Sequence, residues 1–140
     1  MSAGFLIAAA LAWLTGAAPP GRYVKPDPDT VLDTQTQLLW GAAAVASGTS
    51  AASAALCAAL TSRGGGWRLP RIQELSTLVD ERQAYAPVLD TAFFSLGRDL
   101  SLWSTSPAAG GRVFVLDAHT GATLPKTPDT TASALCVHDI

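Results

Sequence analysis

The chain has 140 residues, of which 49% are hydrophobic and 14% are charged, and its formal net charge is −2. This length is enough for one domain and little else. Its Lys and Arg residues are scattered along the chain and form no cluster. The sequence therefore lacks the basic face that nucleic-acid binding or electrostatic attachment to a membrane surface requires.

The N-terminal segment has the pattern of a cleaved signal peptide, which we place at residues 1–17. An apolar run over residues 5–14 is followed by small residues at 15–18. The run is shorter than the ~20 apolar residues needed to span a bilayer. Because no Lys or Arg precedes the run, an uncleaved N-terminal anchor is the alternative. The sequence predicts export, with no membrane span after cleavage, to the periplasm, the cell surface or the medium.

Residues 18–29 are predicted to be an extended, Pro-rich linker, because their four prolines prevent a helix. The domain proper is predicted to cover residues 30–140. It opens with a β-hairpin, whose strands are expected over residues 30–33 and 37–40. Residues 41–49 are small and irregular.

Two helices are expected next. Thr49 or Ser50 caps the first, which extends to about residue 62 and is ended by three glycines. Pro70 suits the first turn of the second, over residues 71–82, where apolar residues recur at spacings of three and four. Strands are expected over residues 100–105, 112–117 and 134–138, with a polar loop over 125–131. Early helices and late strands indicate an α+β fold.

The chain has two cysteines, Cys57 and Cys136. In an exported protein such a pair is expected to form one disulfide. Two unpaired thiols in a cytosolic protein are the alternative. Two cysteines are too few for a structural zinc site.

Several motifs, in the same order along the chain, carry a resemblance to a known family. They are Thr30-Val31-Leu32-Asp33 with Leu38-Leu39-Trp40, an alanine-rich helix with Cys57, Trp67-Arg68-Leu69-Pro70 with Glu74-Leu75, Phe93-Phe94 with Trp103-Ser104, and Cys136-Val137-His138. The chain resembles the Lcl C-terminal domain family from about Tyr23 to His138. Two positions depart from the family pattern. Gln37 replaces a turn glycine, which predicts another turn geometry, and His138 replaces an arginine.

The resemblance implies a C-type-lectin-like fold, with two helices packed on short antiparallel strands, and a disulfide between Cys57 and Cys136. It also implies an exported, often adhesive protein. The calcium motifs of sugar-binding C-type lectins are absent, and Pro26 and Pro28 interrupt the acidic spacing of residues 27–33. We expect no metal and no cofactor.

The tryptophans have two possible roles, as sugar-stacking platforms or as core residues. Core packing is favoured for Trp40, Trp67 and Trp103. Trp103 is also a candidate ligand contact, because it adjoins the late loops. Arg68 is expected to form a structural ion pair with Glu74 or Asp80 rather than to contact a ligand.

The sequence contains no convincing set of catalytic residues. Asp117 and His119 with Ser104 or Ser106 would be a triad by residue type only, since no nucleophile-elbow motif is present. Glu74 has no evident partner carboxylate. An enzyme is therefore the least favoured hypothesis.

The favoured hypothesis is an exported, non-catalytic binding module that recognises a polysaccharide or a surface protein. Its ligand surface is expected on the late loops, residues 104–112 and 117–131, because loops on a rigid scaffold carry binding residues. The candidate ligand-binding residues are Trp103, Ser104, Arg112, Asp117, His119 and Lys126. The alternative is a structural subunit of an envelope or appendage assembly, as an oligomer or with other proteins.

Overall fold

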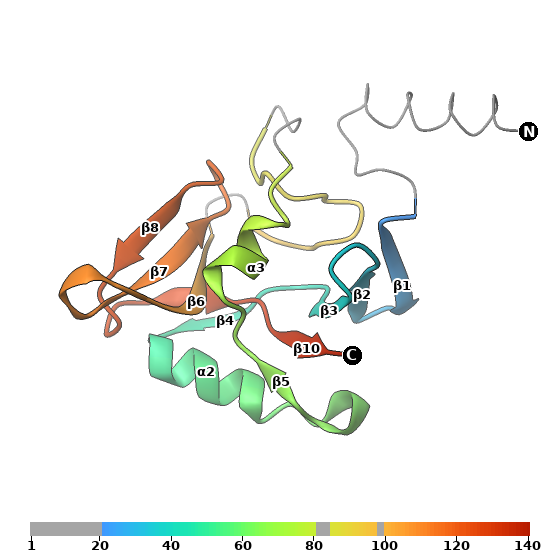
Figure 1. Cartoon of the computed structure of the whole chain (residues 1–140), viewed down its shortest axis with the longest axis horizontal. Coiled ribbons are helices and arrows are strands. Elements are labelled where there is room, and N and C mark those ends of the chain that lie inside the picture. Colours follow the sequence, from blue (N-terminus) through green and yellow to red (C-terminus); the bar gives the residue numbers. More distant parts are fainter. Residues whose placement is uncertain (1–20, 81–84, 98–99) are drawn as a thin grey trace, which may run out of the picture.

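Two five-stranded sheets and two α-helices make up the computed structural model, which describes residues 21–80, 85–97 and 100–140 (Figure 1). The first sheet has the order β1-β2-β3-β10-β5, with β1 Tyr23–Asp27, β2 Thr30–Asp33, β3 Leu38–Gly41, β10 Val137–Asp139 and β5 Trp67–Arg68. The second has the order β4-β9-β6-β7-β8, with β4 Val45–Gly48, β9 Ala132–Ala134, β6 Ser101–Ala108, β7 Arg112–Asp117 and β8 Thr123–Lys126. The helices are α2 Ser50–Ala58 and α3 Ile72–Ser76, and the short 3-10 turns are η1 Ser62–Gly64 and η2 Ala109–Gly111. The predicted α+β class, with one disulfide, is confirmed.

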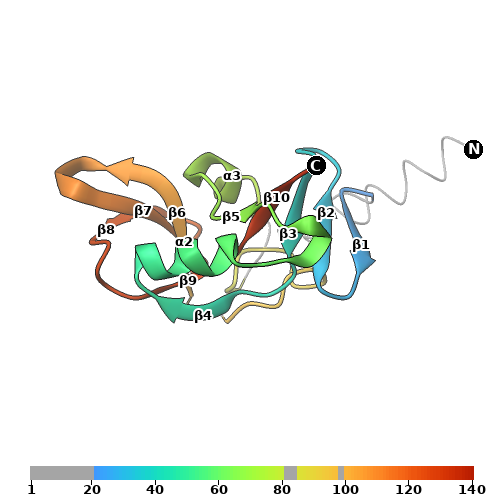
Figure 2. The same ribbon diagram turned by 90° about the horizontal axis from the view of Figure 1, so that it is seen from below.

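The sheets lie side by side along the length of the molecule, with β1 at one end and β7 and β8 at the other (Figures 1 and 2). Their strand pairs are antiparallel except for β6 with β9. Helix α2 packs on β4, β5 and β9, and α3 packs on β6 and β7. Helix α2 therefore bridges the two sheets.

The predicted linker, residues 18–29, is wrong over its described part. Prolines do keep it extended, but β1 pairs with β2 as an edge strand of the first sheet. Arg22 forms an ion pair of 3.1 Å with the fully buried Asp33 and donates a bond of 2.7 Å to the Thr77 carbonyl. This segment thus belongs to the fold. The predicted signal peptide, residues 1–17, lies outside the described residues.

The predicted opening hairpin is confirmed as β2 and β3, which pair from Thr30 with Gly41 to Asp33 with Leu38. The prediction that Gln37 changes the turn geometry is wrong. Gln37 has φ +60°, the left-handed conformation that a glycine would adopt there. Its amide Nε2 donates a bond of 2.9 Å to the Thr34 carbonyl, which holds the turn closed.

Both helices are shorter than predicted. Thr49 caps α2 as expected, accepting a bond of 3.2 Å from the Ala52 N–H, but the helix ends at Ala58. Helix α3 ends at Ser76, where the hydroxyl of Thr77 bonds to the Glu74 carbonyl at 2.6 Å. Such local bonds compete with helical ones. The Asp80 N–H then bonds to the Val88 carbonyl, so the chain has left the helix.

The late part of the chain differs from the prediction in three places. Residues 134–138 do not form one strand, because the chain leaves β9 at Ala134 and enters β10 of the other sheet at Val137. Strand β8 occupies part of the predicted loop 125–131, and β4 part of the irregular segment 41–49. Strand β6 extends into the predicted ligand loop 104–112.

The core has two clusters of buried side chains. One contains Trp40, Leu75 and Phe94 and lies against the first sheet and α3. The other surrounds the disulfide between Cys57 and Cys136, which closes a separation of 79 residues, and includes Trp67 and Trp103. The disulfide predicted from the cysteine pair is confirmed, and it ties α2 to the segment that joins β9 and β10.

Candidate functional site

The Trp67-Arg68-Leu69-Pro70 motif places a cation at the end of the first sheet. The Arg68 guanidinium donates two bonds to Glu74, of 2.8 and 2.9 Å, and two to Asp139, of 3.2 and 2.9 Å. The predicted structural ion pair is therefore present, with Glu74 as its partner. Glu74 also accepts a bond of 2.8 Å from the Arg71 N–H, which caps α3.

This ion-pair network shifts the pKa values of its members. Hydrogen bonds from Arg68 lower the pKa of Glu74 from its ordinary 4.5 to about 2, and those from Glu74 raise the pKa of Arg68. Bonds from Arg68 also lower the pKa of Asp139. A carboxylate held this firmly in its ionised form serves structure rather than proton transfer near neutral pH.

All three motif tryptophans lie in the core, as predicted for Trp40 and Trp67. Trp40 is fully buried and Trp67 is 5% exposed. The Trp67 indole N–H donates a bond of 2.8 Å to the Ser62 carbonyl. The Trp67 and His138 rings pack edge to face, with 5.2 Å between their centroids. His138 in turn bonds through Nε2 to the Gly65 carbonyl at 2.7 Å. The residue that departs from the family pattern thus fastens the glycine-rich turn.

Of the two roles weighed for Trp103, the structure shows core packing, although Trp103 and Ser104 were candidate ligand-binding residues. Trp103 and Ser104 both have no exposed surface. The Trp103 indole N–H donates a bond of 2.9 Å to the Gly48 carbonyl, and the Ser104 hydroxyl donates one of 2.7 Å to the Phe114 carbonyl. Trp103 belongs to the buried cluster around the disulfide, which includes Cys57 and Trp67. Both side chains are therefore used within the fold, and the Ser104 hydroxyl is not a free nucleophile.

The four polar candidates lie on the hairpin of β7 and β8, which we call the late hairpin, but at its opposite ends. Arg112 begins β7, and Lys126 ends β8 opposite Val113. Asp117 ends β7, where its carboxylate accepts a bond of 2.8 Å from the His119 N–H. Arg112 and His119 are exposed, and Asp117 and Lys126 are partly exposed. The structure therefore brings the candidates together as two pairs and not as one site.

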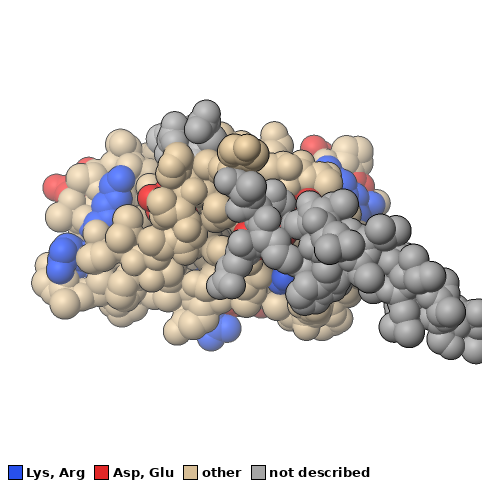
Figure 3. Space-filling model, turned by 90° about the horizontal axis from the view of Figure 1, so that it is seen from above, with Lys and Arg blue, Asp and Glu red and all other residues tan. Residues whose placement is uncertain are grey.

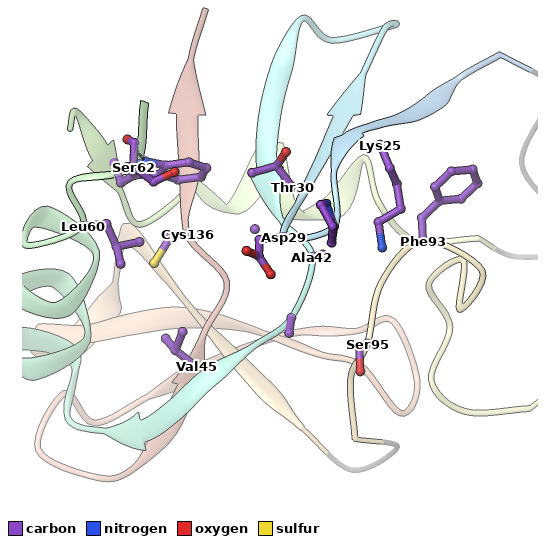
Figure 4. Close-up of a pocket in the computed structure, with 14 residues that line it drawn as sticks. Lys25, Asp29, Thr30, Ala42, Val45, Leu60, Ser62, Phe93, Ser95 and Cys136 are labelled. Carbon is purple, nitrogen blue, oxygen red and sulfur yellow. Dashed lines mark hydrogen bonds between the residues drawn. The ribbon is translucent and has the colours of Figure 1, made fainter. Parts of the chain in front are cut away.

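A hollow of about 410 Å³ lies where the two sheets meet, and we call it the central hollow (Figure 4). It is lined by Lys25, Pro28, Asp29, Thr30, Gly41, Ala42, Ala43, Val45, Leu60, Ser62, Trp67, Phe93, Ser95 and Cys136. Its volume is within the ~300–1,000 Å³ typical of small-ligand sites. No predicted ligand-binding residue lines it.

Segments distant in the sequence form the walls of the central hollow. The turn from β1 to β2 and residues 41–45 form one side, and Leu60, Ser62 and Trp67 form another. An ion pair of 2.7 Å between Asp27 and Arg63 joins the β1–β2 turn to η1 beside it. The hydrogen bond from Arg63 lowers the pKa of Asp27, so this carboxylate is held ionised.

Two charged side chains remain available on the central hollow. In Figure 4 the Lys25 ammonium and the Asp29 carboxylate both point toward its open space. Both residues are exposed, and neither side chain has an ion pair or hydrogen bond within the described residues. These two charged groups thus face a lining that is otherwise uncharged.

The described residues hold no group of three or more His, Cys, Asp or Glu side chains placed to share a metal ion. No helix among them is long and apolar enough to cross a membrane. On the face shown in Figure 3, Lys and Arg side chains are spread singly among uncharged surface.

Sequence reasoning missed Lys25, Asp29, Phe93 and Ser95. The first two were assigned to the linker, and the others belong to a stretch with no periodic pattern. One signal was present, because charged residues alternating with prolines at 25–29 indicate an extended segment that presents them in fixed positions.

Comparison with models of known protein families shows which family the chain belongs to. The model of the Lcl C-terminal domain matches residues 29–138, from the β1–β2 turn to β10. The chain belongs to the Lcl C-terminal domain family. The disulfide that the resemblance implied is the one the structure contains. None of the curated proteins matches the chain.

In this Lcl C-terminal domain the motif residues have structural roles. Trp40, Trp67 and Leu69 are buried, Arg68 and Glu74 are paired, and Pro70 is buried beside β6. The lining of the central hollow includes Thr30, Trp67, Phe93 and Cys136 from these motifs, together with residues outside them such as Lys25.

Proposed function

We propose that this Lcl C-terminal domain is an exported, non-catalytic binding module that recognises a surface polymer, a polysaccharide or a surface protein, through the central hollow. The observation that carries the proposal is the hollow itself, where unpaired charged side chains meet an apolar wall at the junction of two sheets. Concave sites with an apolar lining and a few polar groups are the usual form of a ligand site.

The disulfide supports export. Disulfides form and persist in oxidising compartments, and Cys57 and Cys136 are both buried. The described groups with shifted pKa values, such as Glu74 and Tyr23, are ion-paired or buried in the core. A titrating group near neutrality beside a cleft would instead favour catalysis.

The central hollow is preferred over the late hairpin because it is concave and its polar groups converge. The late hairpin divides its polar residues between two ends and has lost Trp103 and Ser104 to the core. Arg112, Asp117, His119 and Lys126 stay a prediction for a second contact surface, which an Arg112→Ala/Lys126→Ala variant tests.

Assembly by strand addition has less support. The edge strands are β1 and β5 in the first sheet and β4 and β8 in the second. Of these, β1 and β8 each contain a proline beside a lysine, Pro26 with Lys25 and Pro125 with Lys126. A proline lacks the N–H that a neighbouring strand would need, and a lysine opposes stacking of edges. These edges favour a separate binding module.

The experiment is a binding screen of the oxidised protein against arrayed glycans and purified surface proteins. Ala43 is exposed and lines the central hollow, so Ala43→Trp places an indole in the space. The matched control is Ala54→Trp, at an exposed alanine of α2 outside the lining. Binding that Ala43→Trp abolishes and Ala54→Trp keeps is the expected result. Binding that only the Arg112→Ala/Lys126→Ala variant loses would move the site to the late hairpin.

A further inference from the structure

Two residues of opposite charge on the central hollow, Lys25 and Asp29, lie near each other in the sequence but do not pair. Lys25 and Asp29 belong to the same hairpin, four positions apart, and point toward the same space (Figure 4). No ion pair joins them. The charged residues on either side of them are paired, Arg22 with Asp33 and Asp27 with Arg63.

This pairing leaves one cation and one anion facing the cavity. A ligand with a single charge would be attracted by one of these groups and repelled by the other. A ligand that carries both charges close together satisfies each with its opposite, and the complex gains no net charge.

The rest of the lining accommodates an apolar side chain. Val45, Leu60 and Trp67 form apolar wall, and the Phe93 ring lies beside Lys25 (Figure 4).

We propose that the central hollow binds an α-amino acid group, in which an ammonium and a carboxylate share one carbon and an aliphatic side chain extends along the wall. Asp29 receives the ammonium and Lys25 receives the carboxylate. The inference rests on the proposed binding function and names its ligand class. Two sources share this chemistry, a free amino acid and a diamino acid residue that is attached to a polymer through its side-chain nitrogen.

The test is isothermal titration calorimetry of the oxidised protein with L-leucine and two blocked derivatives, N-acetyl-L-leucine and L-leucine methyl ester. L-leucine is expected to bind, and each blocked derivative is expected to bind about tenfold more weakly, which corresponds to ~1.4 kcal/mol. Nε-acetyl-L-lysine represents the attached source. Its binding in preference to leucine identifies the polymer-attached form, and the reverse order identifies the free amino acid.

Variants that neutralise Lys25 or Asp29 test which side chain binds which charged group of the ligand. Lys25→Gln is expected to weaken the binding of leucine about tenfold. It is expected to leave the binding of the methyl ester, whose carboxylate is already blocked, unchanged. Asp29→Asn is likewise expected to weaken the binding of leucine and to leave that of N-acetyl-L-leucine, whose ammonium is blocked, unchanged. The matched control is Asp129→Asn, at an exposed loop carboxylate outside the lining. This variant is expected to bind leucine as the unchanged protein does.

Two results would overturn the inference. One is no heat of binding for leucine or Nε-acetyl-lysine at millimolar concentration, and the other is equal affinity for leucine and its blocked derivatives. If glycans or surface proteins are still bound through the hollow, only this inference fails. If amino acids bind but no surface polymer does, the inference stands and the proposed recognition of a polymer fails.

Discussion

Replacing Glu74 with Gln tests the ion-pair network that joins the motif arginine to the end of the chain. The carboxylate accepts bonds from Arg68 and from the Arg71 N–H, and the residue is 8% exposed. Its pKa falls from 4.5 to about 2, and each pKa unit corresponds to ~1.4 kcal/mol of stability at neutral pH. The whole pKa shift would correspond to a stabilisation of ~3.4 kcal/mol. Because solvent reaches the partner side chains and screens the interaction, we expect a contribution of about 2–3 kcal/mol.

The pH dependence has a definite sign. Because the folded pKa of Glu74 is lowered, its contribution is present above pH 4.5 and is lost as the pH falls toward 2. The difference in unfolding free energy between the unchanged protein and Glu74→Gln is therefore expected to be about 2–3 kcal/mol at pH 7 and to shrink through this window. Asp139 keeps its charge in both proteins at pH 7, so it does not produce the difference.

The assay is urea unfolding followed by tryptophan fluorescence, at several pH values from 7 to 2.5. Asp129→Asn is the control, because this loop carboxylate is exposed, and its stability is expected to follow the unchanged protein at each pH. A Glu74→Gln difference that is the same at pH 7 and pH 3 would refute the reasoning, as would no difference at pH 7.

Three further predictions concern the fold. Replacing Cys57 and Cys136 with serine is expected to lower the unfolding free energy by about 4 kcal/mol, because the disulfide closes 79 residues of chain, and equilibrium unfolding of oxidised and variant protein checks it. Arg22→Ala is expected to cost about 3 kcal/mol in the same assay, since it leaves the buried Asp33 without its cation, and a neutral effect would restore the linker interpretation. Trp103→Phe is expected to cost about 1–3 kcal/mol through the lost bond to Gly48, with unchanged ligand affinity, and selective loss of affinity would return Trp103 to the site.

Local signals in the sequence were sufficient for several elements. Two short apolar runs separated by a turn-like segment predicted β2 and β3, and Thr49 or Ser50 as a cap predicted the start of α2. The order of motifs predicted the family and, with the cysteine pair, the disulfide. These features depend either on residues close together in the sequence or on the order of the family motifs. Both can be recognised in a single sequence.

The remaining features depend on tertiary pairing. β1 is extended because of its prolines, but only its pairing with β2 makes it part of the sheet. Trp103 adjoins a predicted loop, yet it packs in the buried cluster around the disulfide, which brings together residues distant in the sequence. The central hollow combines residues from 25 to 136, and no local pattern indicates that these meet.

Mapping the bound ligand by amide chemical shifts is the most direct test that the central hollow is the binding site. A ¹⁵N-labelled sample is titrated with the strongest ligand from the binding screens, and the shifts of all assigned amides are compared. The account predicts that the shifts concentrate at residues 25–30, 41–45, 62–67 and 93–95, which line the hollow or lie between lining residues. Shifts confined to the late hairpin, between Arg112 and Lys126, with an unmoved hollow would contradict it.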